Sequence, residues 1–401
     1  MLINRVFIVV LDGAGVGALP DAEQFGDQGS NTLGHVIRQN KGIRIPNLIS
    51  LGLKKILTEK YFAKITAPEK ILGAHGKMAE LSPGKDTTTG HWELAGLVQK
   101  DPFPLYPQGF PPAIISSFEK ITGRGVLGNI PYSGTEIIKK FGEKHLQTGC
   151  PIVYTSADSV FQVAAHQDVV PLDTLYAWCS KAREKIFVGK HALGRVIARP
   201  FEGVPGNFVR SAAGRRDYSL PPPGPTILSL ALESGHQVWT VGKVSDIFAG
   251  KNITRHLPAT GNQNIMQVIN DALQENFTGI LWANLVDFDM LYGHRNDPRG
   301  FARALEEFDL FLERALHLLR AGDLLAITAD HGCDPTFKGT DHTREYVPLL
   351  IYSPDITAID LGTRKSFADL GATVAQLLGC KPTVDGQSFA GKLFREGSER
   401  Q

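Results

Sequence analysis

The sequence lacks the features that mark several protein classes. It has only 4 cysteines in 401 residues, and none of them forms a CxxC pair. A disulfide framework or a zinc knuckle is therefore not expected, and reduced thiols are the simple interpretation. The apolar run near the N-terminus, Val6 to Leu11, is too short for a signal peptide. No segment approaches the roughly 20 apolar residues of a membrane span. We therefore expect a cytoplasmic protein without a membrane partner.

An excess of charge of one sign is also missing. Lys and Arg number 42 and Asp and Glu number 41, so the formal net charge is +1. This balance gives no electrostatic reason to expect a nucleic-acid partner. The apolar share of 42% and the charged share of 21% are typical of a globular enzyme. The length of 401 residues exceeds one ordinary core and predicts two domains, or one domain with an insertion.

Uninterrupted apolar, β-branched runs predict strands that are buried on both faces. The runs are Val6 to Leu11, Val238 to Val241, Leu281 to Val286, Leu324 to Thr328 and Val347 to Tyr352. Helical patterns lie between them, and the clearest is Phe301 to Leu319, with apolar residues three and four positions apart. Strands that alternate with helices predict an α/β fold whose mostly parallel sheet is flanked by helices.

The middle of the chain differs from both ends. The proline-rich stretches DPFPLYPQGFPP (101–112) and PPPGP (221–225) bracket further strand-like runs, Ile152 to Thr155 and Val196 to Ala198. Proline-rich stretches suit linkers and hinges. We therefore predict an α+β cap domain at 99–221, inserted into a discontinuous core domain made of 1–98 and 222–401.

Three short motifs place Asp and His near the ends of expected strands: DFDMLYGH, TADHG and TDHTRE. Each alone has an ordinary explanation as a surface pair, a helix cap or a salt bridge. Together with the Asp that ends the first strand, they offer mixed carboxylate and imidazole ligands: Asp12, Asp289, His294, Asp330, His331 and His342. Such a set suits two divalent ions, which can clamp the attacking and leaving oxygens of a phosphoryl group. The sequence therefore predicts metal-dependent phosphoryl transfer.

A candidate nucleophile lies in SPGKDTTTGHWELAG, 82–96. Thr87, Thr88 and Thr89 precede a helical run that we expect to begin near His91. A threonine at a helix N-terminus faces unpaired N–H groups, which favour an alkoxide and then a phosphothreonine. The alternative is a capping cluster without chemistry.

At these residues the chain resembles the phosphopentomutase family of the alkaline phosphatase superfamily. The matching stretches run nearly end to end and include LDGAGVGALPDAEQFGDQGSNTLGH, GKDTTTGHWE, SGTEI, YTSADSVFQVAAH, GRVIARPF, GNFVR, VGKVSDI, NLVDFD, YGHRNDPRG, TADHGCDP, GTDHTREYVPLL and SFADLGATVA. The resemblance implies an alkaline-phosphatase-like core with an inserted cap that recognises the substrate.

The resemblance also implies roles for single residues. One metal ion would be held by Asp289, His294 and His342, and the other by Asp12, Asp330 and His331. Thr87 would be the nucleophile. The implied substrate-binding residues are Ser156, Asp158, Arg195, Arg210 and Lys243, with the two arginines on the distal phosphate.

The implied activity is an isomerase reaction, an intramolecular phosphotransfer between ribose 1-phosphate and ribose 5-phosphate or their 2-deoxyribose equivalents. It would run through a phosphothreonine and a bisphosphate intermediate, and it belongs to nucleoside catabolism. The implied metal is Mn²⁺, although Zn²⁺ or Mg²⁺ suit the same ligands. A sugar bisphosphate such as glucose 1,6-bisphosphate would be the activator. We expect a monomer or a weak homo-oligomer. The alternatives are a metal-dependent phosphohydrolase and a cofactor-independent phosphoglycerate mutase of the same superfamily.

One position departs from the family pattern. Gly13 follows the first expected metal ligand where a small hydroxyl residue is expected. We therefore expect a missing hydrogen bond near Asp12 and weaker metal binding there.

Overall fold

The computed structural model describes residues 3–57, 61–62, 70–156 and 159–394. The chain forms two compact units. The core unit consists of Met1–Asp101 and Pro222–Gln401, and the inserted unit is Pro102–Pro221. The first junction lies at 101/102, at the start of the proline-rich stretch, whereas the sequence prediction placed it at 98/99.

The core unit is built on an eight-stranded sheet with the order β10-β9-β11-β1-β12-β13-β2-β14. The strands are β1 (Arg5–Leu11), β2 (Ala74–Met78), β9 (Gln237–Val241), β10 (Arg255–Leu257), β11 (Gly279–Leu285), β12 (Asp323–Thr328), β13 (Val347–Tyr352) and β14 (Asp360–Arg364). The expected strands are therefore present. Only β13 runs antiparallel to its neighbours, so the predicted mostly parallel sheet is confirmed.

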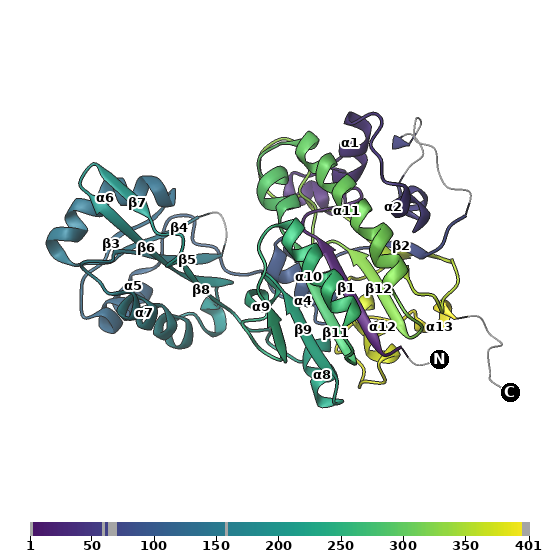
Figure 1. The fold of residues 1–401 in the computed structure, drawn as a ribbon. Coiled ribbons are helices and arrows are strands. Elements are labelled where there is room, and N and C mark those ends of the chain that lie inside the picture. Colours follow the sequence, from purple (N-terminus) through teal and green to yellow (C-terminus); the bar gives the residue numbers. More distant parts are fainter. Residues whose placement is uncertain (1–2, 58–60, 63–69, 157–158, 395–401) are drawn as a thin grey trace. The chain divides into compact units, whose positions relative to one another are not determined.

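The central strands β1 and β11 are buried along their whole length, as their uninterrupted apolar runs predicted. Two groups of helices pack on the sheet. One group is α1 (Thr32–Gln39), α2 (Pro46–Ser50), α10 (Asn262–Gln274) and α11 (Pro298–Leu318), and the other is α4 (Thr87–Leu94), α8 (Ile227–Glu233), α9 (Val244–Ile247) and α12 (Ala368–Leu377). Figure 1 shows α10 and α11 in front of the sheet and α12 behind it. The shorter elements are η1 (Ala22–Phe25), α3 (Leu53–Ile56), η4 (Phe288–Gly293) and α13 (Ala390–Leu393).

The inserted unit has its own sheet, with the order β3-β4-β5-β6-β7 and β8 paired to β6. Its elements are α5 (Pro112–Thr122), β3 (Leu127–Pro131), α6 (Gly134–Thr148), β4 (Ile152–Thr155), β5 (Val160–His166), α7 (Leu172–Lys185), η3 (Gly189–His191), β6 (Arg195–Val204), β7 (Asn207–Arg210) and β8 (Arg216–Ser219). Alternate residues of the strands enter two different apolar clusters. Phe161 and Val163 pack with α5 and α7, whereas Tyr154 and Ala164 pack with α6. Strands with two buried faces explain why these runs are continuously apolar.

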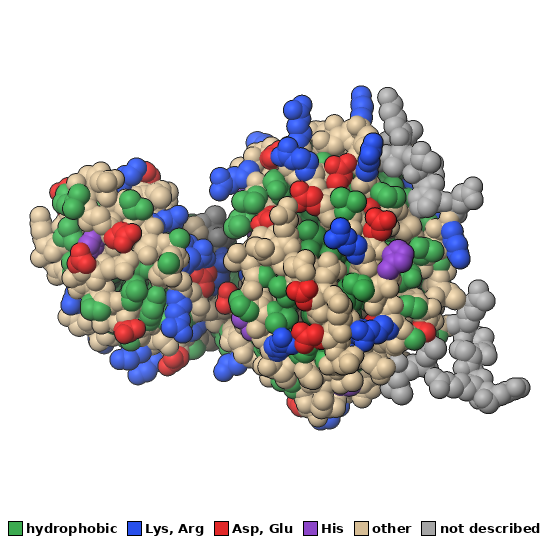
Figure 2. Space-filling model, in the orientation of Figure 1, with side chains coloured by type: hydrophobic (Ala, Val, Ile, Leu, Met, Phe, Trp, Pro, Cys, Tyr) green, Lys and Arg blue, Asp and Glu red, His purple; other side chains and the backbone are tan. Residues whose placement is uncertain are grey.

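The surface agrees with the balanced composition. On the face shown in Figure 2, basic and acidic side chains are interspersed over the described residues of the core unit. Among the helices of the described part of the chain, none is both long and apolar enough to cross a membrane.

Candidate active site

The sheet of the core unit brings the expected metal ligands to one edge. β1 and β12 are parallel neighbours, so Asp12 and Asp330 follow them at the same end. β11 lies on the other side of β1 and leads into η4, which carries Asp289. His342 precedes β13, and it reaches this edge because β13 runs antiparallel to β12. Residues more than 300 positions apart in the sequence therefore share one site.

Asp289, His294 and His342 form one side of this site. The Nε2 atom of His294 lies 3.1 Å from Oδ2 of Asp289, and the Nε2 atom of His342 lies 3.4 Å from Oδ1. The two Nε2 atoms are 3.2 Å apart. Their rings are stacked with centroids 4.8 Å apart. The Nε2 atoms of the two histidines and the carboxylate of Asp289 therefore face one another across a short distance.

Asp12, Asp330 and His331 form the other side and are all buried. The Nε2 atom of His331 lies 3.3 Å from Oδ1 of Asp12 and 3.5 Å from Oδ2 of Asp330. The ring of His331 stacks on that of His342, with centroids 3.8 Å apart. The two groups therefore adjoin, and the structure brings all six expected ligands together. How they divide between two ions stays a prediction.

Backbone carbonyls hold all three imidazoles in one orientation. The Nδ1 atom of His294 lies 2.6 Å from the carbonyl oxygen of Thr340, and that of His342 lies 2.8 Å from that of Lys85. The Nδ1 atom of His331 lies 3.1 Å from the carbonyl oxygen of Gly332. Since a carbonyl only accepts, each Nδ1 carries a proton and donates it, so each Nε2 is directed into the site. A metal ion would therefore bind through Nε2, in place of any proton on that atom.

The unpaired oxygens of the site also fit a cation. Oδ1 of Asp12, Oδ1 of Asp289 and Oδ2 of Asp330 are buried without a well-aligned hydrogen-bond donor among the described residues. Burial alone would raise the pKa of Asp289, but His342 and His294 hold that pKa well below its ordinary value. Burial opposes a charge on His331, yet Asp330 and Asp12 raise its pKa to about 10. The carboxylates thus create a strongly negative field that divalent ions would neutralise.

Thr87 lies beside this site as the first residue of α4. Its Oγ1 atom is 3.2 Å from Nε2 of His331 and 3.4 Å from Nζ of Lys243. The same Nζ lies 3.5 Å from Oδ2 of Asp12. Of the candidate threonines, Thr87 is therefore in contact with a predicted metal ligand and with a cation.

The helix start expected near His91 was wrong, because α4 begins four residues earlier. Asp86 explains the difference. Its Oδ1 accepts hydrogen bonds from the backbone N–H groups of Thr88 and Thr89, and this cap stabilises a first turn of poor helix formers. The cap contacts are made by Asp86 with Thr88 and Thr89, and the role of Thr87 as the nucleophile stays a prediction.

Two contacts to the metal ligands were not foreseen. Nδ2 of Asn284 donates to Oδ2 of Asp12 at 2.8 Å, and both side chains are buried. Nδ1 of His91 lies 2.9 Å from the carbonyl oxygen of Thr87 and 3.2 Å from Oδ2 of Asp330. Asn284 sits inside an apolar strand, and His91 sits in the buried part of α4. A polar residue in a run that is otherwise buried was the available signal.

Gly13 supplies a different contact from the one expected. Its backbone N–H donates to Oδ1 of Asp330 at 3.1 Å, while Asn284 provides a hydrogen bond to Asp12. The φ angle of Gly13 is +75°, and an added Cβ would lie 2.8 Å from Cβ of Cys333. A hydroxyl side chain would therefore be crowded in this backbone conformation.

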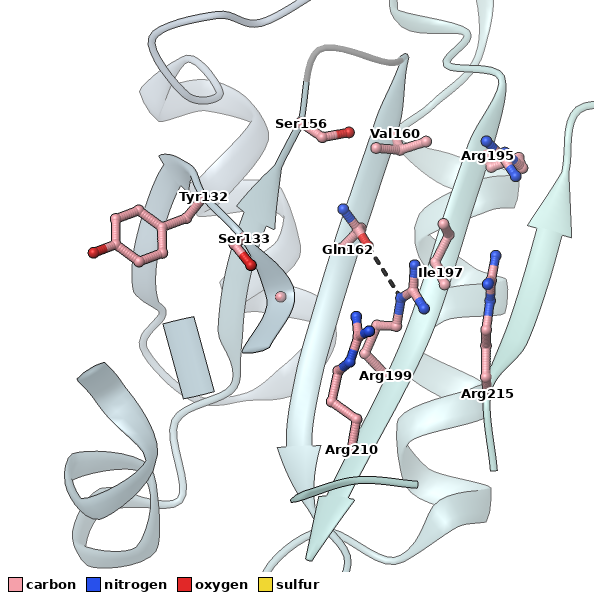
Figure 3. A pocket seen from close by; sticks show the side chains of 11 residues that line it. Tyr132, Ser133, Ser156, Val160, Gln162, Arg195, Ile197, Arg199, Arg210 and Arg215 are labelled. Atoms are coloured by element: carbon pink, nitrogen blue, oxygen red, sulfur yellow. Dashed lines mark hydrogen bonds between the residues drawn. The ribbon is translucent and has the colours of Figure 1, made fainter. Parts of the chain in front are cut away.

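The expected cap residues line a cavity of about 240 Å³ in the inserted unit. Ser156, Arg195 and Arg210 contribute to its wall (Figure 3). Asp158 lies outside the described residues. The wall also holds Arg199 and Arg215, to which the sequence analysis assigned no role. The spacing of Arg195 and Arg199 on one strand face could have indicated Arg199.

Comparison with known proteins gives a consistent picture. The model of the metalloenzyme superfamily matches residues 4–382. The phosphopentomutase of Caldanaerobacter subterraneus subsp. tengcongensis is 56% identical over 394 residues, which are 98% of each chain. That of Carboxydothermus hydrogenoformans is 53% identical over 97% of this chain and 99% of its own. That of Acetivibrio thermocellus is 52% identical over 98% and 100%, respectively.

Among solved structures, the PH0037 protein from Pyrococcus horikoshii has a TM-score of 0.50 at 14% identity and covers 94% of this chain and 98% of its own. At that identity it supports the fold alone. The superfamily match and the ligand groups together indicate the use of divalent metal. The identity to three phosphopentomutases over nearly the whole length is decisive, and this chain belongs to the phosphopentomutase family.

Proposed function

We propose that this chain interconverts ribose 1-phosphate and ribose 5-phosphate, and the 2-deoxyribose equivalents, with Thr87 as the residue that carries the phosphoryl group. The observation that supports this most directly is the position of Thr87 Oγ1, 3.2 Å from Nε2 of His331 and 3.4 Å from Nζ of Lys243. A hydroxyl at the start of a helix, next to an ammonium group, has the surroundings that favour its deprotonated form.

Two divalent ions would be held by Asp289, His294 and His342 and by Asp12, Asp330 and His331, and when bound they would act as Lewis acids on the phosphoryl oxygens. We propose Mn²⁺ as the metal, since the carboxylates suit this oxygen-preferring cation, which also accepts imidazole ligands. Zn²⁺ and Mg²⁺ are the competing ions.

The transfer then has three stages. A sugar bisphosphate such as glucose 1,6-bisphosphate first phosphorylates Thr87. The phosphothreonine passes its phosphoryl group to the unphosphorylated hydroxyl of a bound pentose phosphate, whose proton is released, and Thr87 recovers its oxygen as an alkoxide. The resulting bisphosphate returns its other phosphoryl group to Thr87 and leaves as the isomer. Lys243 lies 3.4 Å from Oγ1 of Thr87, where its charge would stabilise the alkoxide that attacks in the first and third stages and leaves in the second.

The inserted unit would bind the rest of the substrate. Arg195 and Arg210 offer planar forks that match the oxygens of the distal phosphate, and Ser156 offers a hydroxyl to the sugar. Asp158 is proposed as a second sugar contact. A mutase must retain its bisphosphate and exclude water from the phosphoenzyme, which a separate substrate-binding unit can serve. We also propose that the chain acts in the cytoplasm as a monomer or a weak homo-oligomer.

The test is the conversion of ribose 1-phosphate to ribose 5-phosphate with Mn²⁺, with and without glucose 1,6-bisphosphate. Thr87→Ala is expected to abolish turnover while the bound metal stays the same. Thr88→Ala is the matched control, because it removes the neighbouring threonine and is expected to keep most of the activity. Radiolabelled glucose 1,6-bisphosphate should transfer a labelled phosphoryl group to the wild type and to Thr88→Ala, but not to Thr87→Ala.

Two results would contradict the proposal. Full turnover by Thr87→Ala would remove the nucleophile assignment. Release of free phosphate by the wild type, without ribose 5-phosphate, would make the chain a phosphohydrolase instead.

A further inference from the structure

The cavity of the inserted unit holds more cationic groups than the two that the proposed function uses. Arg195 and Arg199 lie on β6, Arg210 lies on β7, and Arg215 immediately precedes β8. All four line the same cavity of about 240 Å³. Figure 3 shows the side chains of Arg199 and Arg210 extending from adjacent strands into one region. Four guanidinium groups around so small a space repel one another, so other groups must orient them.

Strand alternation explains how they come to one face. Arg195 and Arg199 are four residues apart, so their side chains leave β6 on the same side. The residues between them, Val196 and Ala198, enter the apolar cluster on the opposite side. Arg215 pairs with Asp217 two positions on, whereas Arg216 lies over the rings of Tyr176 and Tyr218, 5.3 and 5.4 Å from their centroids.

A hydrogen bond to Gln162 orients the guanidinium group of Arg199. Its Nε–H donates to Oε1 of Gln162 at 3.0 Å, which fixes the plane of the guanidinium (Figure 3). Both Nη groups, with four further N–H donors, belong to the same plane. Burial, followed by the charge of Arg215, lowers the pKa of Arg199. A like charge close to a partly buried cation is unfavourable unless an anion joins them.

Asp217 holds Arg215 in a similar way. Its carboxylate accepts from Nε and Nη2 of Arg215, both at 2.7 Å, in the two-point geometry of a guanidinium–carboxylate pair. It also lies 3.7 Å from Nη1 of Arg195. Burial would raise the pKa of Asp217, but the bond to Arg215 lowers it below the ordinary value. Among the described residues around the cavity, one carboxylate, that of Asp217, faces four guanidinium groups, so positive charge is in excess there.

The start of α6 adds to this field. Ser133 and Gly134, at the N-terminus of this 15-residue helix, line the same cavity. An added Cβ on Gly134 would lie 2.7 Å from Nη1 of Arg210 and 2.7 Å from the hydroxyl of Tyr154. The missing side chain therefore makes room for Arg210 beside the helix end, where backbone N–H groups also attract anions.

We propose that Arg199 and Arg215 bind the distal phosphate of the substrate together with Arg195 and Arg210, and that Asp217 is a positioning residue that orients Arg215. This inference rests on the proposed function, because it takes the pentose phosphate as the ligand. A phosphate monoester carries up to two negative charges, and a bisphosphate carries two such groups. Four arginines can hold the distal phosphate while the other end of the sugar receives the phosphoryl group from Thr87, and they can hold the newly formed phosphate after the bisphosphate has turned.

The test compares Arg199→Gln and Arg215→Gln with Arg216→Gln, the control whose side chain lies on the aromatic rings. In the mutase assay, KM for ribose 1-phosphate is expected to rise about tenfold or more in the first two and to stay within about twofold in the control. Hydrolysis of p-nitrophenyl phosphate, which has no distal phosphate, should be unchanged in all three. Asp217→Asn keeps the shape and should raise KM in the same selective way. If circular dichroism shows that Arg199→Gln is unfolded, Arg199→Lys replaces it in the assay, because lysine keeps the charge but loses the planar fork.

An unchanged KM in folded Arg199 and Arg215 variants would overturn the proposal, as would an equal loss of p-nitrophenyl phosphate hydrolysis. A wild-type KM in Asp217→Asn would remove the positioning role. Calorimetric titration of ribose 5-phosphate into the full Mn²⁺-loaded chain separates this inference from the proposed function. If the wild type fails to isomerise the sugar, weaker binding by both arginine variants still supports the phosphate contacts, and unchanged binding refutes them.

Discussion

Gly90 sets how closely the helix that carries Thr87 approaches the metal site. It lies in α4, one turn after Thr87, against the strand end that carries Asp330. An added Cβ would overlap the carbonyl oxygen of Asp330 and lie only 2.8 Å from its carbonyl carbon. Ordinary contacts of this kind are 3.4–4 Å. Gly90→Ala therefore forces a displacement on the order of 1 Å between α4 and the end of β12.

A shift of this size moves Thr87, the proposed nucleophile, relative to the predicted metal ligands. Misplacement by about 1 Å can cost roughly 100-fold in rate. We therefore expect Gly90→Ala to lower kcat by about that factor, with a smaller change in KM because the distal phosphate is proposed to bind in the inserted unit. The overpacking should also cost about 1–3 kcal/mol of unfolding free energy.

The assay is steady-state conversion of ribose 1-phosphate, together with urea unfolding of each variant. Gly391→Ala is the matched control, since Gly391 also lies in a helix and an added Cβ there meets nothing within 4 Å. The control should keep wild-type kcat and stability. Equal kcat values for Gly90→Ala and Gly391→Ala would refute the argument that this close approach positions Thr87.

Three further predictions concern the metal site. Gly13→Ala should lose about 1–3 kcal/mol more stability in urea than Gly26→Ala, because Gly26 has a similar φ of +74° but open space around it, whereas Gly13 faces Cys333; equal losses would contradict the crowding. Asn284→Leu should weaken Mn²⁺ binding about 10- to 100-fold in a calorimetric titration, because Asp12 loses its 2.8 Å hydrogen bond; unchanged affinity would show that this bond does not orient the ligand. Removal of metal by a chelator should lower the Tm, and adding Mn²⁺ at about 100 times its Kd should raise the free energy of unfolding by about 2.7 kcal/mol. A Tm that is insensitive to metal would argue against the site.

Much of the core could be predicted from sequence because its strands are buried on both faces. A short uninterrupted run rich in β-branched residues, such as Val6 to Leu11, favours a buried strand over a helix, and the polar residue that ends it marks the sheet edge. The direction of β13 could not be predicted in this way. Apolar pattern is the same for parallel and antiparallel strands, so the pattern alone gave no physical reason to place His342 at that edge.

The start of α4 and the role of two arginines were not predicted from the sequence, because they depend on a local helix cap and on the pairing of strands. The start of α4 was placed too late because three threonines are weak helix formers, whereas the contact of Asp86 with their N–H groups decides the boundary. Arg199 lies in the matching stretch GRVIARPF but was given no role, and Arg215 lies in none of the matching stretches. Their shared direction follows from the register of β6 and β8, which pairs Ile197 with Asp217 and is set only when the sheet forms.

The carbonyl groups that hold the imidazoles have a consequence for the order of folding. The Lys85 carbonyl that orients His342 belongs to the segment that leads into Thr87, and the two are 257 positions apart. The metal ligands themselves span positions 12 to 342. Closing such long loops is among the last events in folding, so high-affinity metal uptake should begin only when the sheet is complete. A chain interrupted before β13 would leave the ribosome without a working metal site, and metal content would report how many molecules have finished folding.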